Sequence, residues 1–286
     1  MIRVVKCGGQ VLDNDALLEA FCRDFAAMEG PKVLVHGGGA LAGKFQKALG
    51  IEPVKYEGRR VTDDATLQVV TMVYAGWCNK RVVSLLQAAG CDAVGLSGCD
   101  GSVVTASKRP PIALSDGRVV DFGQVGDVTP ASVRTDFLRL LLDNGLTPVL
   151  CAINHDGAGQ LLNTNADTVA ASVAAALGAG LTTCFEQPGV LMDRNDPSSV
   201  IPFIDKDKYA SLKASGVVAD GMIPKLDQAF DALEKGAAEV RICHSATLLS
   251  DAGTTVSLAP SVIQLPPSAI QNPPSVILSE AKESKP

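Results

Sequence analysis

Apolar runs of strand length alternate with amphipathic stretches of helix length along most of this chain. Residues 2–7 form the first strand-like run, and helical periodicity follows over residues 15–28. Such alternation predicts βα units around a mostly parallel sheet, which places the chain in the α/β class. The other expected elements are strands at 32–38, 92–97, 146–154, 181–191 and 239–245 and helices at 40–50, 65–90, 135–145, 166–180 and 225–236.

Two regions depart from this alternation. Residues 102–125 are turn-rich, which favours a hairpin or two at the edge of the sheet. Residues 260–286 contain a seven-residue repeat with proline at its joints, and proline at this density blocks helices and central strands. An extended or disordered tail is expected there, although a proline-rich tail can also be a ligand for a partner. A further boundary is expected near residue 178.

Composition and charge exclude several classes of protein. A net charge of -6 argues against broad nucleic-acid binding but still permits a small anionic substrate. The eight cysteines form no CxxC pair, which favours reduced thiols in a cytoplasmic protein. We expect no signal peptide, and no segment reaches the roughly 18 consecutive apolar residues of a membrane span. His36, His155 and His244 show no HxxxH spacing, so no metal site is expected.

Three glycines, Gly37 to Gly39, follow the apolar strand residues Lys32 to His36 and precede a helix. This arrangement lets backbone N–H groups approach an anion at a helix N-terminus. A dinucleotide fingerprint fits weakly, because it ends at Ala42 without a clear acidic residue for the ribose. A P-loop match from Gly38 to Lys44 lacks the hydroxyl residue that binds Mg²⁺, since Phe45 stands in its place. A tight turn without a ligand remains an alternative.

A second glycine pair, Gly8 and Gly9, also follows a strand and precedes a helix. Both glycine turns are therefore expected at the carboxyl edge of one sheet, where ligands bind in α/β proteins. Lys6 lies directly before the first turn. Its side chain could extend to solvent, but beside two such turns phosphate binding is the better explanation.

Polar residues precede two later helices. Asn163, Asn165 and Asp167 lie before an alanine-rich helix, where Asp167 could also be an ordinary N-terminal residue that favours the helix dipole. Lys225 stands near the start of another helix, where a cation opposes the dipole. An anion between that lysine and the helix would explain its position.

The segments VKCGG, VHGGG, GRRVTD, NTNAD and ADGMIPK, in this order, resemble the amino acid kinase family, and most closely its kinases of N-acylated glutamate. The resemblance covers residues 2 to about 256. It implies an open three-layer αβα sandwich, with the acyl amino acid bound in residues 1–178 and ATP with Mg²⁺ in residues 179–259. The implied reaction is phosphorylation of the side-chain carboxylate of N-acetyl-L-glutamate in arginine synthesis, in the cytoplasm.

The resemblance also implies roles for particular residues. Lys6 and Lys225 would neutralise the transferring phosphoryl group, and Asp167 would hold both ammonium groups. Gly9 and Gly38 would donate backbone hydrogen bonds to the phosphoryl oxygens. Gly38, Gly39, Arg60, Asn163 and Asn165 would hold the acyl amino acid. The nucleotide would contact Lys6, Gly9, Glu186, Gly189, Val190, Leu191, Val217, Ala219 and Lys225.

Some features leave alternatives open. Glu186 stands where family members commonly have aspartate, which puts the nucleotide contacts in doubt. Arg59, next to Arg60, could face solvent or add positive charge near the substrate, so the choice between an acetyl and a succinyl group stays open. Two rival functions remain: a kinase of the same family that acts on another acid, such as aspartate or an aminoadipate derivative, and a nucleotide-binding regulator without catalysis. Arginine-inhibited hexameric relatives have an additional N-terminal helix, and only five residues precede Lys6 here. We therefore expect a homodimer without strong arginine feedback, with an interface on residues 65–89 that includes Tyr74, Ala75, Gly76 and Trp77.

Overall fold

The computed structural model describes residues 1–219 and 221–259. At its centre lies one eight-stranded sheet. Neighbouring strands are parallel from β5 to β15, which confirms the α/β assignment, and β16 runs antiparallel to β15. Across the sheet the strands are β14 (Phe203–Ile204), β16 (Thr254–Val256), β15 (Glu239–His244), β13 (Gly180–Phe185), β1 (Arg3–Cys7), β2 (Lys32–His36), β10 (Thr147–Cys151) and β5 (Ala93–Leu96).

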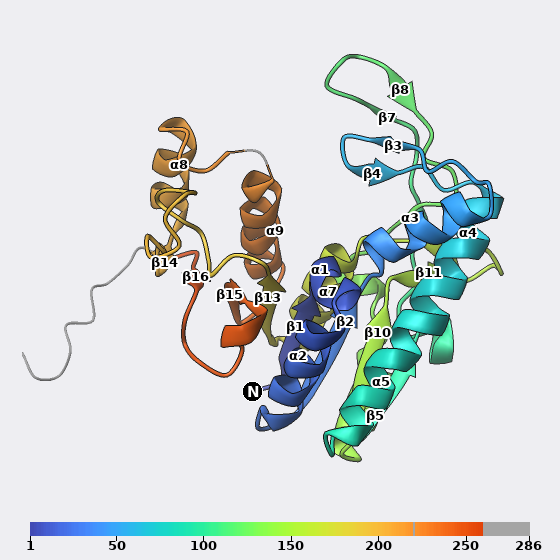
Figure 1. Ribbon diagram of the computed structural model, residues 1–286, viewed down its shortest axis with the longest axis horizontal. Coiled ribbons are helices and arrows are strands. Elements are labelled where there is room, and N and C mark those ends of the chain that lie inside the picture. Colours follow the sequence, from blue (N-terminus) through green and yellow to red (C-terminus); the bar gives the residue numbers. More distant parts are fainter. Residues whose placement is uncertain (220, 260–286) are drawn as a thin grey trace, which may run out of the picture.

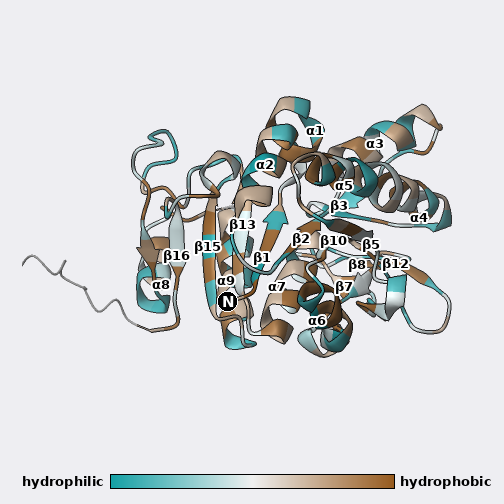
Figure 2. Ribbon diagram, turned by 90° about the horizontal axis from the view of Figure 1, so that it is seen from below, coloured by the Kyte–Doolittle hydropathy of each residue, from teal (hydrophilic) through white to brown (hydrophobic). Residues whose placement is uncertain are grey.

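Helices cover both faces of this sheet, which makes the three-layer sandwich (Figure 2). One face carries α1 (Gly9–Asp13), α2 (Asp15–Ala27), α3 (Gly39–Ala48), α4 (Asp64–Thr71) and α5 (Asn79–Ala88), and the other carries α6 (Thr135–Asp143), α7 (Ala166–Leu177) and α9 (Met222–Glu234). The other helical segments are α8 (Lys206–Ala214), which lies beside the β14 edge, and short 3-10 turns at Asp100–Ser102, Pro130–Ser132 and Ser245–Thr247.

The alternation of side chains along β1 explains how the sheet joins the two helical layers. Val4 packs in the core with residues of α7, such as Val173, whereas Val5 packs with Phe21 of α2. All three valines are fully buried. Because successive side chains of a strand point to opposite faces, Lys6 shares the face of Val4. The lysine therefore lies in the layer that contains α7.

The helix expected over residues 65–90 forms as one continuous helical segment. It consists of α4, a π-helical turn (Met72–Cys78) and α5. Asp63 caps its N-terminus, because its carboxylate accepts a hydrogen bond of 2.7 Å from the backbone N–H of Thr66. The π turn was not predicted, and such turns often occur at functional sites.

The hairpins expected in residues 102–125 also form, but they do not extend the large sheet. They pair with themselves, and Figure 1 shows β3, β4, β7 and β8 together beyond one end of the sheet. Their placement at the sheet edge was wrong, because these short strands pair with one another in separate two-stranded sheets: β7 and β8 form a hairpin, and β6 and β9 pair on either side of it. The pairs are β3 (Lys55–Tyr56) with β4 (Arg59–Arg60), β6 (Ser107–Lys108) with β9 (Gly126–Asp127), β7 (Ile112–Ala113) with β8 (Val119–Val120), and β11 (Ile153–His155) with β12 (Leu161–Asn163).

The sheet continues across the boundary expected near residue 178, since β13 pairs directly with β1. All eight cysteines are free thiols, and seven are buried, in line with their apolar neighbours in the sequence. Among the helices described, none has the length and apolarity needed to cross a membrane. The proline-rich segment 260–286 lies outside the described residues.

Candidate active site

The two glycine turns lie side by side, as predicted. β1 and β2 are parallel neighbours whose last residues, Cys7 and His36, are in register. Gly8 and Gly37 therefore leave the same edge of the sheet at adjacent positions. β13 ends at this edge as well, with Cys184 opposite Cys7.

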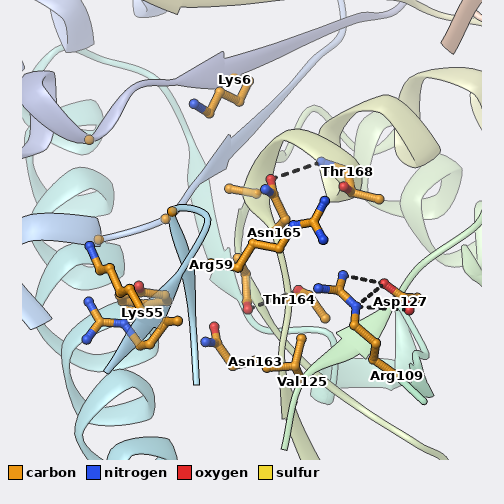
Figure 3. Close-up of a pocket in the computed structure, with 18 of the residues that line it drawn as sticks. Lys6, Lys55, Arg59, Arg109, Val125, Asp127, Asn163, Thr164, Asn165 and Thr168 are labelled. Atoms are coloured by element: carbon orange, nitrogen blue, oxygen red, sulfur yellow. Dashed lines mark hydrogen bonds and ion pairs between the residues drawn. The ribbon is translucent and has the colours of Figure 1, made fainter. Parts of the chain in front are cut away.

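A cavity of about 670 Å³ opens at this edge (Figure 3). Its walls come from β1, both glycine turns, the hairpins and the start of α7. Gly39, the next glycine of the second turn, begins α3. The predicted site residues that line the cavity are Lys6, Gly9, Gly38, Arg60, Asn163 and Asn165.

Lys6 forms an ion pair with Asp167, with 2.9 Å between Nζ and Oδ1. Lys6 is only 8% exposed, so its ammonium needs this carboxylate for compensation. Asn165 caps α7 by accepting hydrogen bonds from the N–H groups of Asp167 and Thr168. The cap fixes the first turn of α7 and thereby the position of the carboxylate.

The Gly38 turn is shaped by Tyr74, a side chain of the π turn. A Cβ at Gly38 would lie 2.5 Å from the Tyr74 ring, so only glycine fits there without movement. Burial raises the pKa of Tyr74, which keeps its hydroxyl protonated. The Tyr74 ring lies against the Gly38 turn and forms part of the cavity wall.

Arg60 and Asn163 are held by polar side chains around the cavity. The Arg60 guanidinium donates to the Gln46 side-chain oxygen, and buried Gln46 donates in turn to Thr66. Asn163 Nδ2 donates to Thr62 Oγ1 at 3.1 Å. These contacts orient two groups that suit recognition of a carboxylate.

His36 anchors the second glycine turn from inside the core. It is fully buried, and Nδ1 lies 2.7 Å from the carbonyl oxygen of Gly37. Asn79 Nδ2 approaches Nε2 at 3.1 Å and also donates to the Val149 carbonyl. Burial lowers the pKa of His36 to about 4, so the ring is neutral, donates through Nδ1 and accepts through Nε2.

A second cavity of about 340 Å³ lies between β13 and α9. The predicted nucleotide residue Gly189 does not line this cavity. Gly189 packs against Thr254 instead, since an added Cβ would lie only 2.8 Å from Thr254 Oγ1. Lys225 Nζ lies 5.3 Å from the Phe185 ring centroid, which is a cation–π contact. The predicted nucleotide residues in its wall are Glu186, Val190, Leu191, Val217, Ala219 and Lys225.

Asp167 lies close to both predicted catalytic lysines. It pairs with Lys6, and together with Lys225 it lines a small space beside Thr183 and Gln228. Asp167 thus forms an ion pair with Lys6 and lies in the lining of the same small space as Lys225. Gln228 also donates to Thr168, which ties α9 to α7.

Several wall residues were missed from the sequence. Lys55 and Arg109 come from hairpins, Phe185 ends β13, and Tyr74 belongs to the π turn. The glycine at position 58 could have indicated the β3–β4 hairpin, because two-residue hairpin turns require positive φ angles and favour glycine. In the structure Glu57 and Gly58 have φ angles of 47° and 76°. The P-loop alternative finds no support, because Lys44 is exposed on α3 and lines neither cavity.

A mostly parallel sheet with helices on both sides, two adjacent glycine turns and a buried lysine at its edge define the amino acid kinase class. The profile of the amino acid kinase family matches residues 1–244, and the chain belongs to this family. It is 46% identical over 250 residues to the acetylglutamate kinase of Cytophaga hutchinsonii, covering 86% of this chain and 92% of that protein. With the acetylglutamate kinase of Bacteroides fragilis it shares 45% identity over 259 residues, covering 89% and 96%.

Two solved structures share the fold. N-acetylglutamate synthase from Neisseria gonorrhoeae, complexed with coenzyme A and N-acetyl-glutamate, superposes with a TM-score of 0.74 at 23% identity. This match covers 91% of the present chain and 60% of the synthase. Carbamate kinase from Giardia lamblia bound to AMP-PNP has a TM-score of 0.62 at 15% identity and covers 90% and 98%.

Proposed function

We propose that this protein transfers the γ-phosphoryl group of ATP to the side-chain carboxylate of N-acetyl-L-glutamate, a step of arginine biosynthesis. Relatives named acetylglutamate kinase, at 45 and 46% identity over most of their length, support this substrate. The observation that carries the proposal is the Lys6–Asp167 ion pair: Lys6 lines the large cavity, and Asp167 lines a small space together with Lys225, which also lines the second cavity. A bound acceptor and a bound nucleotide would meet at this pair.

In the proposed reaction, a carboxylate oxygen of the acceptor attacks the γ-phosphorus, and the bond to the bridging oxygen of ADP breaks. Lys6 and Lys225 neutralise charge on the transferring group, while Asp167 orients Lys6. The backbone N–H groups of Gly9 and Gly38, which line the large cavity, would donate hydrogen bonds to the oxygens of that group. No general base is required because the nucleophile is already ionised, so catalysis consists of positioning and electrostatic stabilisation.

The acceptor would be held at the end of the large cavity formed by Arg60 and Asn163, with Asn165 nearby. A bidentate guanidinium suits the α-carboxylate. The nucleotide would occupy the smaller cavity, where Val190, Leu191 and Val217 offer an apolar wall for a base. Glu186 would accept hydrogen bonds at its rim.

Mg²⁺ is proposed to accompany the nucleotide. Within residues 1–219 and 221–259 no group of three or more His, Cys, Asp or Glu side chains is arranged to hold a metal. The residues present therefore fit an ion held chiefly by phosphates and water, as Mg²⁺ commonly is. When bound, the ion would neutralise phosphate charge.

The assembly is proposed to be a cytoplasmic homodimer. The π turn exposes Met72 and Trp77, which are 59 and 60% accessible. Two large apolar side chains on one helical surface are suited to an interface core.

A direct assay tests the proposed function. The purified protein is incubated with ATP, Mg²⁺ and either N-acetyl-L-glutamate or L-aspartate, and the acyl phosphate is trapped with hydroxylamine. We expect hydroxamate from N-acetyl-L-glutamate, in amounts equal to the ADP formed, and none from aspartate. ADP without hydroxamate, or a product from aspartate alone, would contradict the proposal.

A further inference from the structure

The second glycine turn contains a peptide unit that its own residues leave free to rotate. In the peptide bond between Gly37 and Gly38, the carbonyl belongs to Gly37 and the N–H to Gly38. Both residues lack a Cβ, so rotation of this unit meets little steric resistance from side chains of its own. Because the bond is trans, the carbonyl and the N–H point in opposite directions. A group that holds the carbonyl therefore also sets the direction of the N–H.

His36 holds that carbonyl. The residue is the last of β2 and is fully buried, and its Nδ1 lies 2.7 Å from the Gly37 oxygen. A carbonyl oxygen can only accept, so Nδ1 carries a proton and donates it. The Gly38 N–H must then point away from the His36 ring. In the described part of the chain this N–H donates to no residue, whereas the Gly38 carbonyl accepts from Ala42.

Two further side chains fix the state of the His36 ring. Lys80 Nζ donates to Asn79 Oδ1 at 3.1 Å, so the other end of the Asn79 amide, Nδ2, faces His36. Nδ2 donates to His36 Nε2 at 3.1 Å and to the Val149 carbonyl at 3.0 Å. Nε2 therefore accepts, which leaves the proton on Nδ1. This chain of contacts holds the Gly37 carbonyl in one orientation.

The first glycine turn repeats the arrangement with a weaker donor. Cys7 is the last residue of β1 and stands in register with His36. Its Sγ lies 3.7 Å from the carbonyl oxygen of Gly8, in the peptide that carries the Gly9 N–H. A thiol is a weak donor. Gly9 already belongs to α1, whereas Gly38 precedes α3, so the second turn depends more on the side chain that orients it.

We propose that His36 is a positioning residue for phosphoryl transfer: its Nδ1–H holds the Gly37 carbonyl and so presents the Gly38 N–H to the transferring group. The inference rests on the proposed function, in which this N–H donates to the phosphoryl oxygens. Gly38 and Lys6 line the same cavity. A donor that is oriented before the substrate binds needs no reorganisation when charge develops. Without His36 the peptide is free to turn its carbonyl oxygen toward the phosphoryl group, which that oxygen would repel.

Two substitutions separate the two ring nitrogens. His36→Asn places an amide nitrogen close to the position of Nδ1 and keeps the donor to Gly37, whereas His36→Gln places its amide farther out, near Asn79, and loses that donor. We measure kcat, KM for N-acetyl-L-glutamate and KM for ATP. For His36→Gln we expect kcat to fall roughly tenfold or more with a much smaller change in either KM, and for His36→Asn a loss of no more than about threefold.

A control for stability is available on the same strand. Lys32 begins β2, at the opposite end from His36, and its buried ammonium donates to the carbonyls of Ala26 and Met28. Lys32→Met removes both hydrogen bonds, so we expect a lower urea midpoint, as for His36→Gln, but an unchanged kcat of the folded enzyme. A merely structural role of His36 would give both variants the same result.

Two kinetic results would overturn the inference: a wild-type kcat in His36→Gln, or an equal loss of kcat in His36→Asn and His36→Gln. Failure of the proposed function looks different, because the wild type then forms no acyl phosphate from N-acetyl-L-glutamate. In that case crystal structures of the two variants decide the positioning role. The Gly37 carbonyl should keep its direction in His36→Asn and lose it in His36→Gln, and the same direction in both variants would refute the role.

Discussion

Lys6 at the end of β1 and Asp167 in the first turn of α7 form an ion pair of 2.9 Å in which only 10% of the lysine side chain is exposed. Each residue is placed by its own element, Lys6 by the alternation of the strand and Asp167 by the Asn165 cap. The pair therefore presents a cation of fixed position to the cavity. Such preorganisation is what stabilisation of a charged transition state requires.

Replacing either lysine should affect turnover more than binding. We expect Lys6→Ala and Lys225→Ala each to lower kcat about 10²- to 10³-fold with a much smaller change in KM, because both act on charge that develops during transfer. Steady-state kinetics with N-acetyl-L-glutamate measure this. Lys235→Ala is the control, since its ion pair with Asp231 lies on the surface of α9. Near-wild-type kcat in either active-site variant would exclude the two-lysine mechanism.

The close contact between Gly38 and Tyr74 predicts a steric effect. Gly38→Ala would force a Cβ to within 2.5 Å of the Tyr74 ring, so we expect loss of about 1–3 kcal/mol of unfolding free energy together with loss of activity. Gly76→Ala is the control, because open space surrounds that position. Urea unfolding compares the variants. Equal midpoints for Gly38→Ala and the wild type would show that the turn can move away from the ring.

Burial of neutral His36 predicts a pH dependence of stability. Its pKa is about 4 in the folded protein and 6.5 in the ordinary state. Between these values the unfolded chain takes up a proton that the folded chain refuses, so stability falls as the pH drops from 6.5 to 4, by on the order of 3 kcal/mol. Unfolding free energies across this range should fall less steeply for His36→Gln. Identical slopes would remove His36 as the cause.

Magnesium should bind with the nucleotide rather than alone. Calorimetry of the protein without nucleotide is expected to show no tight Mg²⁺ site, whereas a nonhydrolysable ATP analogue should bind more tightly when Mg²⁺ is added. Calcium in place of Mg²⁺ serves as the comparison. Micromolar Mg²⁺ affinity in the absence of nucleotide would require a carboxylate site that the proposal lacks.

The π turn predicts the surface of association. Tyr74 faces the cavity and is 7% exposed, so Trp77 and Met72 are the large apolar residues left for a partner. We expect the wild type to be a dimer and Trp77→Lys to be a monomer in light scattering, while Leu140→Lys, an exposed position on the opposite helical layer, stays dimeric. Arginine should not change the mass. A hexamer, or a mass that responds to arginine, would contradict this assembly.

Much of the fold could be predicted because its signals are local. The strand that contains Lys6, the helix that starts near Asp167 and both glycine turns are each indicated within about ten residues of sequence, by hydrophobic periodicity and turn residues. Parallel order then places all strand ends at one edge, so Lys6, Gly9 and Gly38 could be assigned to one site without coordinates.

The α/β class, the order of the main elements and the residues at the sheet edge thus follow from local patterns in the sequence. Three features came only from the folded chain: two-residue strands lie beside the cavity, Tyr74 lies against Gly38, and Lys55 and Arg59 line the cavity. Periodicity cannot reveal these contacts, because strands of two residues have no measurable period and their partners are distant in sequence. Such positions depend on how separately formed elements pack, which is set by long-range burial and hydrogen bonding rather than by local propensity.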